Sequence, residues 1–306
     1  MTAKAHPELA GSTIPVFTSS LGADDTMRAY RAVIDAWPID RAELSVPTSF
    51  GDTHVIAGGP PDGAPVVLLH ALFATATAWY RNVEALSRQH RTYCVDVIGE
   101  ANKSSPTRPI TSMDDFLQWF QELIDGLGID TLYLVGNSYG GFTAAYYSMK
   151  LPERVRKLVL VGPASTIHSM SPFMRHMFLP KGLYMAAPWL PGLERVMSAS
   201  VDWMHAGLPL DPLWGPLFIE TMKHGRLINR VFPGVYTKEE LTEIAAQVLL
   251  IFGDREVIYG DLDEAIRSGK DLMPDASVAV IPNAHHIAAL AQPEAVNQEL
   301  LRFFAA

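Results

Sequence analysis

Uninterrupted apolar runs alternate with amphipathic segments over most of the chain. The runs are hydrophobic at nearly every position, whereas the segments between them repeat hydrophobic residues every three or four positions. Strands that are apolar throughout are buried on both faces. Such strands, separated by amphipathic helices, are typical of α/β proteins with a parallel sheet. The predicted strands are 66–70, 91–97, 131–135, 155–161, 247–252 and 277–281, and the predicted helices are 79–89, 113–127, 142–150, 262–272 and 293–304.

The pattern differs ahead of the first of these strands. Residues 24–37 place hydrophobic side chains on one helical face, and Pro38 ends the predicted helix. Two short predicted strands, 43–46 and 53–57, lie on either side of a turn, and a loop rich in Gly and Pro follows them. We therefore expect an N-terminal segment, residues 1–42, with one short helix.

The alternation stops between residues 165 and 240, where no strand pattern occurs. We interpret this stretch as a helical cap inserted into one α/β core, which then comprises residues 43–164 and 241–306. Methionine fills irregular apolar space and aromatic rings form flat apolar surfaces, so the cap is expected to cover an apolar pocket as well as to pack on the core. The clustered residues are Met170, Met174, Met177, Met185, Met197, Met204, Met222, Trp189, Trp203 and Trp214.

A strand-like run ends in Gly136-Asn137-Ser138-Tyr139-Gly140, and a helix-compatible run follows at once. A serine that acts as a nucleophile must be exposed on a sharp turn, and glycines on either side remove side chains that would collide there. The amide of Tyr139 would then point toward the negative charge that develops on an attacked carbonyl. The stretch predicts a nucleophile elbow, although a tightly packed turn without chemistry would show the same pattern.

A nucleophilic serine needs a basic histidine and an acid behind it. In α/β sheets both are expected on loops that follow strands, because ligands bind outside the carboxyl ends of the strands. The loop after 277–281 carries His285 and His286, and the loop after 247–252 carries Asp254 and Glu256. The chain order of serine, acid and histidine is the order expected with a nucleophile elbow.

Composition and charge exclude several classes of protein. The 306 residues are 48% hydrophobic and 19% charged, and the net charge of −9 argues against binding to nucleic acid or to an anionic membrane surface. Cys94 is the single cysteine and lies in an apolar strand, so we expect a buried, inert thiol and no intrachain disulfide. Residues 1–13 lack the apolar core of a secretory signal and no window approaches 18 apolar residues, so a soluble cytoplasmic protein is expected.

No residue spacing indicates a cofactor or a metal. We find neither a phosphate-binding nor a dinucleotide-binding motif, and no internal repeat. Four histidines of the insertion lack the spacing of metal ligands and are interpreted as structural or solvent-facing. They are His168, His176, His205 and His224.

Four motifs together resemble the α/β-hydrolase superfamily, and more narrowly its capped serine carboxylesterase-type members. They are 136–141, the sequence His70-Ala71-Leu72, the turn 253–256 and the loop 283–286. The resemblance covers roughly residues 43–306. It implies an α/β-hydrolase fold with a mostly parallel central sheet, helices on both faces and a helical cap.

The resemblance also implies roles for individual residues. Ser138 corresponds to the nucleophile, His286 rather than His285 to the base, and Glu256 rather than Asp254 to the acid. The loop 162–164 has no carboxylate, which removes the acid position that some relatives use. The remaining candidates for the acid are Asp261 and Asp263.

The oxyanion hole implied by the resemblance consists of the amides of Leu72 and Tyr139. His70 is expected to hold this loop by hydrogen bonds rather than to transfer a proton. Ala71 replaces the usual glycine, and it would be strained if the position required a positive φ. Asp96 begins a structural turn to which we assign no chemistry.

The implied activity is hydrolysis of small, uncharged carboxylic esters through an acyl-enzyme on Ser138, without a cofactor. Alternatives with the same fold are cleavage of a carbon–carbon bond in a diketone-like compound, hydrolysis of a lactone, and binding of a ligand without catalysis.

Overall fold

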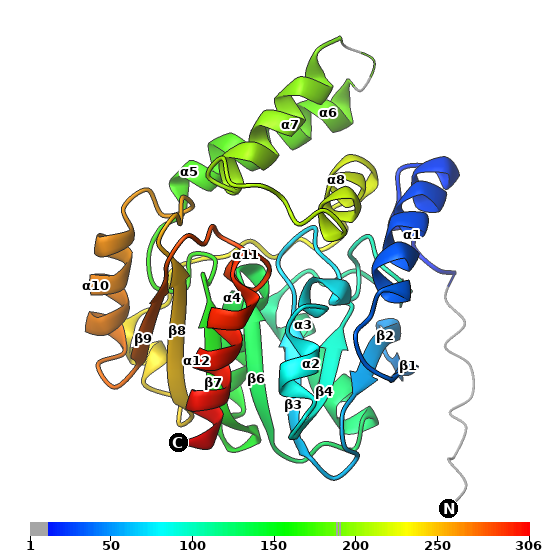
Figure 1. Cartoon of the computed structure of the whole chain (residues 1–306). Helices are drawn as coiled ribbons and strands as arrows, with labels where there is room; N and C mark the ends of the chain where they lie inside the picture. The colour runs from blue at the N-terminus through cyan, green and yellow to red at the C-terminus, as the bar shows by residue number, and fades with distance from the viewer. Residues whose placement is uncertain (1–11, 188, 190) are drawn as a thin grey trace, which may run out of the picture.

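The chain forms one mixed β-sheet covered by helices (Figure 1). The structure is a computed structural model and describes residues 12–187, 189 and 191–306, so most of the segment 1–13 lies outside the described residues. The strand order is β1-β2-β4-β3-β6-β7-β8-β9, and β5 pairs with β2. The strands are β1 (Arg41–Thr48), β2 (Gly51–Gly58), β3 (Ala64–Leu69), β4 (His90–Val95), β5 (Ser105–Pro106), β6 (Leu132–Asn137), β7 (Val155–Val161), β8 (Gln247–Gly253) and β9 (Ser277–Ile281).

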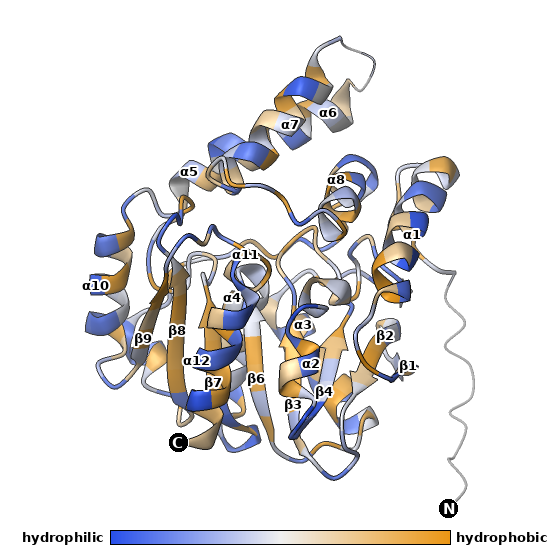
Figure 2. Ribbon diagram, viewed as in Figure 1, coloured by the Kyte–Doolittle hydropathy of each residue, from blue (hydrophilic) through white to orange (hydrophobic). Residues whose placement is uncertain are grey.

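Most of the sheet is parallel, as predicted. β1 and β2 form an antiparallel hairpin and β2 is antiparallel to β4, whereas all neighbouring strands from β4 to β9 run parallel. The central strands are hydrophobic along their length in Figure 2, and the last four residues of β3 and the last five of β7 are buried. The continuous apolar runs in the sequence arise because helices cover both faces of these strands.

Helices α2 (Val83–Leu86) and α12 (Pro293–Ala305) lie on one face of the sheet, and α3 (Met113–Gly126) and α4 (Tyr139–Lys150) pack together on the other. The start of α3 illustrates how the sequence defines these elements. The side chain of Ser112 accepts a hydrogen bond from the amide of Asp115, and acidic residues in the first turn favour the positive end of the helix. Among the described helices, none is long and apolar enough to cross a membrane.

The predicted helix 79–89 is wrong, because two short elements replace it. A 3₁₀ turn (Ala76–Trp79) is followed by the single turn of α2. Between them the buried side chain of Asn82 donates a hydrogen bond to Asn297 on α12 at 2.8 Å. Asn297 in turn donates to the carbonyl of Arg81 at 3.3 Å. This contact with a distant helix interrupts a segment whose local pattern favours a continuous helix.

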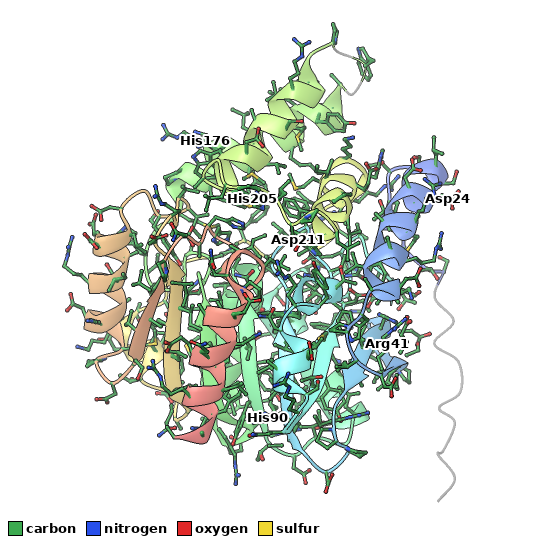
Figure 3. The ribbon with its side chains drawn as sticks, in the orientation of Figure 1. Asp24, Arg41, His90, His176, His205 and Asp211 are labelled. Atoms are coloured by element: carbon green, nitrogen blue, oxygen red, sulfur yellow. The ribbon has the colours of Figure 1, made fainter. Side chains whose placement is uncertain are left out.

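Between β7 and β8 the described residues form several helices joined by loops, with no strand among them. Helices α6 and α7 extend above the sheet in Figure 1, and α8 lies beside α1 (Ser20–Asp35). Asp211, which precedes α8, accepts hydrogen bonds from the hydroxyl of Tyr80 at 2.7 and 2.8 Å and so attaches the insertion to the core (Figure 3). The helices after β7 are α5 (Ser171–Phe173), a π-helical turn (Met174–Phe178), α6 (Leu179–Ala186), α7 (Leu193–Met204), α8 (Trp214–His224), α9 (Lys238–Leu241), α10 (Leu262–Leu272) and, after β9, α11 (Ala288–Ala291).

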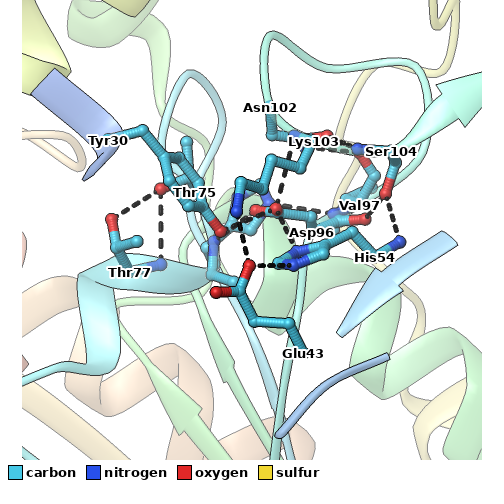
Figure 4. A network of polar contacts seen from close by, with 12 residues as sticks. Tyr30, Glu43, His54, Thr75, Thr77, Asp96, Val97, Asn102, Lys103 and Ser104 are labelled. Carbon is cyan, nitrogen blue, oxygen red and sulfur yellow. Dashed lines mark hydrogen bonds and ion pairs between the residues drawn. The ribbon is translucent and has the colours of Figure 1, made fainter. Parts of the chain in front are cut away.

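A buried carboxylate joins four segments that are distant in the sequence (Figure 4). Asp96, which follows β4 and is fully buried, accepts hydrogen bonds from Tyr30 of α1 and His54 of β2, each at 2.9 Å. Its other oxygen accepts from the amide of Ala76, at 2.7 Å, in the segment that follows β3. Burial raises the pKa of Asp96, but the hydrogen bond and charge of His54, the charge of His70 and the amide of Ala76 together hold that pKa below its ordinary value.

We expect Asp96→Asn to lower the free energy of unfolding at pH 7 by about 3 kcal/mol, because it removes one member of a buried ion pair. A group whose pKa is lowered on folding stabilises the folded state above its unfolded pKa, near 3.8, and loses that contribution as pH falls through the folded value. The difference between wild type and variant should therefore shrink at pH 3.

Urea unfolding of both proteins at pH 7 and pH 3 measures this difference. Asp52→Asn, at an exposed position of β2, is the control and should change the free energy of unfolding by less than about 0.5 kcal/mol. Equal differences between wild type and Asp96→Asn at the two pH values would contradict the proposed role of the ion pair.

Candidate active site

Ser138 lies at the turn between β6 and α4, with φ 52° and ψ −113°. Its amide donates to the carbonyl of Val161 and its carbonyl accepts from the amide of Ala164, both at 2.9 Å. The flanking glycines allow a close approach of the backbone: a Cβ at Gly136 would lie 2.2 Å from the carbonyl oxygen of Gly140. The structure therefore contains the strained strand–turn–helix element that the sequence predicted, with the serine at its apex.

His286 and Glu256 form a buried pair. Nδ1 of His286 lies 2.8 Å from Oε2 of Glu256, and the side chains are 2% and 0% exposed. The other carboxylate oxygen, Oε1, accepts hydrogen bonds from the amides of Val257 and Ile258 at 2.9 and 3.1 Å. These amides fix the carboxylate, which in turn fixes the orientation of the imidazole.

The other predicted acids are placed elsewhere. Asp254 is exposed, and its Oδ1 accepts a hydrogen bond from the amide of Ala284 at 3.2 Å, which joins the two loops. Asp261 caps α10 by accepting from the amide of Glu264 at 2.9 Å, and Asp263 lies in the first turn of that helix. Of the candidate acids that the sequence offered, Glu256 is the one that contacts the candidate base, His286.

Nε2 of His286 is buried and has no hydrogen-bond partner within the described part of the chain. Because Nδ1 faces a carboxylate, the ring proton lies on Nδ1 and Nε2 keeps a free lone pair. The hydroxyl of Ser138 makes no hydrogen bond to His286 Nε2 in the described residues. Ser138 is linked to the pair through the loop after β7. Its backbone bonds to both ends of that loop, and a Cβ on Gly162 within the loop would lie 2.8 Å from Glu256 Oε2 and 3.2 Å from His286 Nδ1.

We expect Gly162→Ala to lower kcat by about ten- to a hundredfold, because the added methyl group displaces the carboxylate or the imidazole. Gly162 also has a φ of 47°, which alanine tolerates poorly. Gly128→Ala separates the two effects, since Gly128 has a φ of 72° but an added Cβ would meet no atom of the described residues within 4 Å. Measurements of kcat for ester hydrolysis and of Tm for both variants test this expectation. Equal kcat values for the two variants would contradict it.

The loop predicted to carry the second oxyanion amide follows β3. Neither the amide of Leu72 nor that of Tyr139 has a hydrogen-bond acceptor in the described residues, and both residues line one cavity. His70 is fully buried, with Nε2 accepting from the amide of Val97 at 3.0 Å and Nδ1 donating to the carbonyl of Ala71 at 2.8 Å. Because both ring nitrogens are occupied, His70 holds the loop, and burial lowers its pKa.

Phe73, with φ 62°, is the strained residue of this loop. Ala71 is not among the described residues that have a positive φ. Alanine at position 71 is therefore unstrained. Glu100 Oε2 accepts from the amide of Phe73 at 3.0 Å, and the hydroxyl of Thr221 on α8 donates to its carbonyl at 2.5 Å. Sequence patterns do not predict these contacts, because a positive φ at phenylalanine has no local pattern.

The insertion covers the cavity with aromatic and aliphatic side chains. Phe178, Val231 and Phe232 line it together with Leu72 and Tyr139. The buried methionines instead pack within the insertion or on the core, and among the described residues no methionine lines this cavity. These methionines are Met170, Met177, Met197, Met204 and Met222, whereas Met174 and Met185 lie outside the described side chains. Of the tryptophans, Trp214 is buried, Trp189 is exposed and Trp203 stacks on His176.

The insertion also contacts the histidine loop of the core. The ring of His205, at the end of α7, packs edge-on against His285 with centroids 4.4 Å apart, and Figure 3 places His205 between the insertion and the sheet. Nδ1 of His285 accepts from the amide of Ile287 at 3.1 Å. Burial lowers the pKa of His205 to about 4 and that of His285 to about 2, so both rings are neutral at pH 7.

His224 has neighbours that its sequence position did not reveal. It belongs with Asp25 and Glu220 to a group whose potential metal-ligand atoms lie within 4.8 Å of one another, where α1 meets α8. Its Nε2 lies 3.3 Å from Glu220 Oε2. His168 Nδ1 lies 3.2 Å from the hydroxyl of Ser268, and His176 Nδ1 lies 2.8 Å from the carbonyl of Pro172.

Comparison with known proteins agrees with the fold. A family model described as the α/β hydrolase fold matches residues 64–205. The chain is also 34% identical to carboxylesterase YbfK of Bacillus subtilis over 90% of its own length and 92% of that protein. The chain therefore belongs to the α/β-hydrolase family.

Within this family the similarity extends to solved structures of bacterial carboxylesterases. The crystal structure of carboxylesterase CesB (YbfK) from Bacillus subtilis superposes with a TM-score of 0.82 and 33% identity, over 93% of this chain and 98% of that one. That of naproxen esterase from the same organism superposes with a TM-score of 0.81 and 31% identity, over 94% and 99%. The similarity covers the sheet and the helical insertion alike.

Proposed function

We propose that this protein is a carboxylic ester hydrolase that works through an acyl-enzyme on Ser138. The observation that carries the proposal is the buried His286–Glu256 pair, whose Nε2 is free to accept a proton. It is supported by the similarity to carboxylesterases along nearly the whole chain. The assignment of the individual residues rests on their geometry.

The reaction follows from these positions. The oxygen of Ser138 attacks the ester carbonyl while His286 Nε2 takes the hydroxyl proton, and Glu256 stabilises the imidazolium that forms. The amides of Tyr139 and Leu72 stabilise the tetrahedral oxyanion. When the intermediate collapses, His286 returns the proton to the leaving alkoxide, and an alcohol departs. Water then repeats the two steps on the acyl-serine and releases the acid.

The cavity beside the amides of Leu72 and Tyr139 favours a small, uncharged and largely apolar part of an ester, and its described lining does not include Ser138 or His286. Its lining contains Leu72, Phe73, Phe178, Val231 and Phe232, and such walls lower the free energy of apolar groups that leave water. The chain's net charge of −9 gives no attraction for an anionic substrate.

A fluorophosphonate probe, which labels activated serines, tests the nucleophile. We expect one labelled peptide, containing Ser138, and burst release of p-nitrophenol from short-chain p-nitrophenyl esters. Labelling elsewhere, or no labelling, would contradict the proposal. Turnover of a vinylogous diketone or a lactone with no turnover of simple esters would instead favour carbon–carbon bond hydrolysis or lactone hydrolysis on the same fold.

A further inference from the structure

Glu100 is a buried carboxyl group that the ester hydrolysis scheme does not use. It lies in the loop after β4 and is 6% exposed. It lines the same cavity as Leu72 and Tyr139, whose amides form the proposed oxyanion hole. Apolar pockets contain few polar groups, and those present fix the orientation of a ligand. Glu100 is therefore a candidate for orienting a bound ligand.

The two oxygens of Glu100 have different surroundings. Oε2 accepts the hydrogen bond from the amide of Phe73 at 3.0 Å, whereas Oε1 is buried without a partner in the described part of the chain. Burial, together with the charge of Asp96, raises the pKa of Glu100 to about 8, so the group is mostly protonated at pH 7. Since an amide only donates, Oε2 is the carbonyl oxygen and the proton lies on Oε1.

We propose that Glu100 forms a polar subsite in which Oε1–H donates a hydrogen bond to an oxygen acceptor that the substrate carries close to its scissile carbonyl. The subsite selects esters with an ether, hydroxyl or carbonyl oxygen at that place over esters with a methylene there. This inference rests on the proposed function, since it names the substrates of the same site.

The surroundings favour a hydrogen-bond donor over a charged group. The carboxylate of Asp96 disfavours a second negative charge on Glu100. Two cations lie in the same region of the described residues: the exposed Arg226 lines the cavity, and the buried Lys181 lies 5.5 Å from the centroid of the Phe73 ring. The hydroxyl of Tyr139 is occupied, because it donates to the carbonyl of Val231 at 3.2 Å. A buried donor left without an acceptor costs free energy, and a substrate oxygen removes that cost.

Two pairs of esters of equal size locate the acceptor. p-Nitrophenyl methoxyacetate and p-nitrophenyl butyrate differ by an ether oxygen in place of a methylene on the acyl side, and the butyrates of 2-methoxyethanol and n-butanol differ similarly on the alcohol side. The readout is the ratio of kcat/KM within each pair. The intrinsic reactivity of the esters and any general loss of activity cancel when this ratio is compared between variants.

We expect Glu100→Leu to lower the ratio in one pair by about tenfold relative to wild type, the value of one hydrogen bond. Glu100→Gln retains an oxygen for the Phe73 amide and an N–H donor at the position of Oε1, so its ratio should stay within about threefold of wild type. The wild-type ratio should also fall as pH rises from 7 to 9, where the donor ionises, whereas that of Glu100→Gln stays flat.

Ratios that are unchanged in Glu100→Leu for both ester pairs would overturn the inference, as would equal loss of the ratio in the leucine and glutamine variants. Circular dichroism and thermal unfolding establish that each variant is folded. If wild type hydrolyses the esters and is labelled at Ser138 but the ratios do not depend on Glu100, the subsite fails while the proposed function stands. If wild type hydrolyses none of them, the proposed function itself fails.

Discussion

Ser138→Ala is expected to lower kcat for a p-nitrophenyl ester by roughly five to six orders of magnitude, as removal of the nucleophile does in other serine hydrolases. The residual rate would reflect binding and the oxyanion amides alone. Alanine keeps the Cβ of serine and the strained φ of 52°, so the fold should be retained, with a Tm close to that of wild type.

Ser148→Ala, in the helix that follows Ser138, is a matched control. Ser148 is also buried, but its hydroxyl donates to the carbonyl of Ala144 at 2.8 Å within α4 and takes no part in the proposed site. This variant should keep its activity and its fluorophosphonate label. If Ser138→Ala retained more than about 1% of wild-type kcat, another residue would have to be the nucleophile.

Glu256→Gln should lower kcat by about four orders of magnitude, comparable to the loss on amidation of a triad carboxylate elsewhere. The amide oxygen of glutamine keeps the bonds from Val257 and Ile258, which places its NH₂ group against His286 Nδ1. Nδ1 must then accept a hydrogen bond, so the ring proton moves to Nε2. In that tautomer the imidazole no longer takes the proton of Ser138.

Asp254→Asn provides the comparison, because the side chain lies two residues away and contacts only the amide of Ala284 among its described hydrogen bonds. We expect it to change kcat by less than about threefold, since an amide oxygen also accepts that bond. Steady-state kinetics on the two purified variants distinguish them. A large loss in Asp254→Asn together with a small loss in Glu256→Gln would mean that the acid has been assigned to the wrong residue.

Local patterns were sufficient for the parallel sheet and for the serine turn. The apolar run of a strand and the glycines around Ser138 each reflect packing that involves residues close together in the sequence. The choice between Asp254 and Glu256 remained open at that level, because exposure and hydrogen bonding separate them only once the two loops meet. The resemblance to a known family supplied the preference.

The errors and omissions involve contacts between distant segments. The helix 79–89 is interrupted by a bond from Asn82 to Asn297, which lies 215 residues further along the chain. The contacts of Phe73 with Glu100 and Thr221 span 27 and 148 residues. Hydrophobic periodicity carries no information about such pairs, since it reports which face of an element is buried and not what covers it.

The bond between Thr221 and the carbonyl of Phe73 has a consequence for protein engineering. Phe73 adjoins the oxyanion loop, and Thr221 belongs to the inserted helices. A chimera that receives this insertion from a relative therefore exchanges one support of the proposed oxyanion loop along with part of the cavity lining. We therefore expect turnover and selectivity to change together in such chimeras, unless the grafted insertion carries a hydroxyl at the position of Thr221.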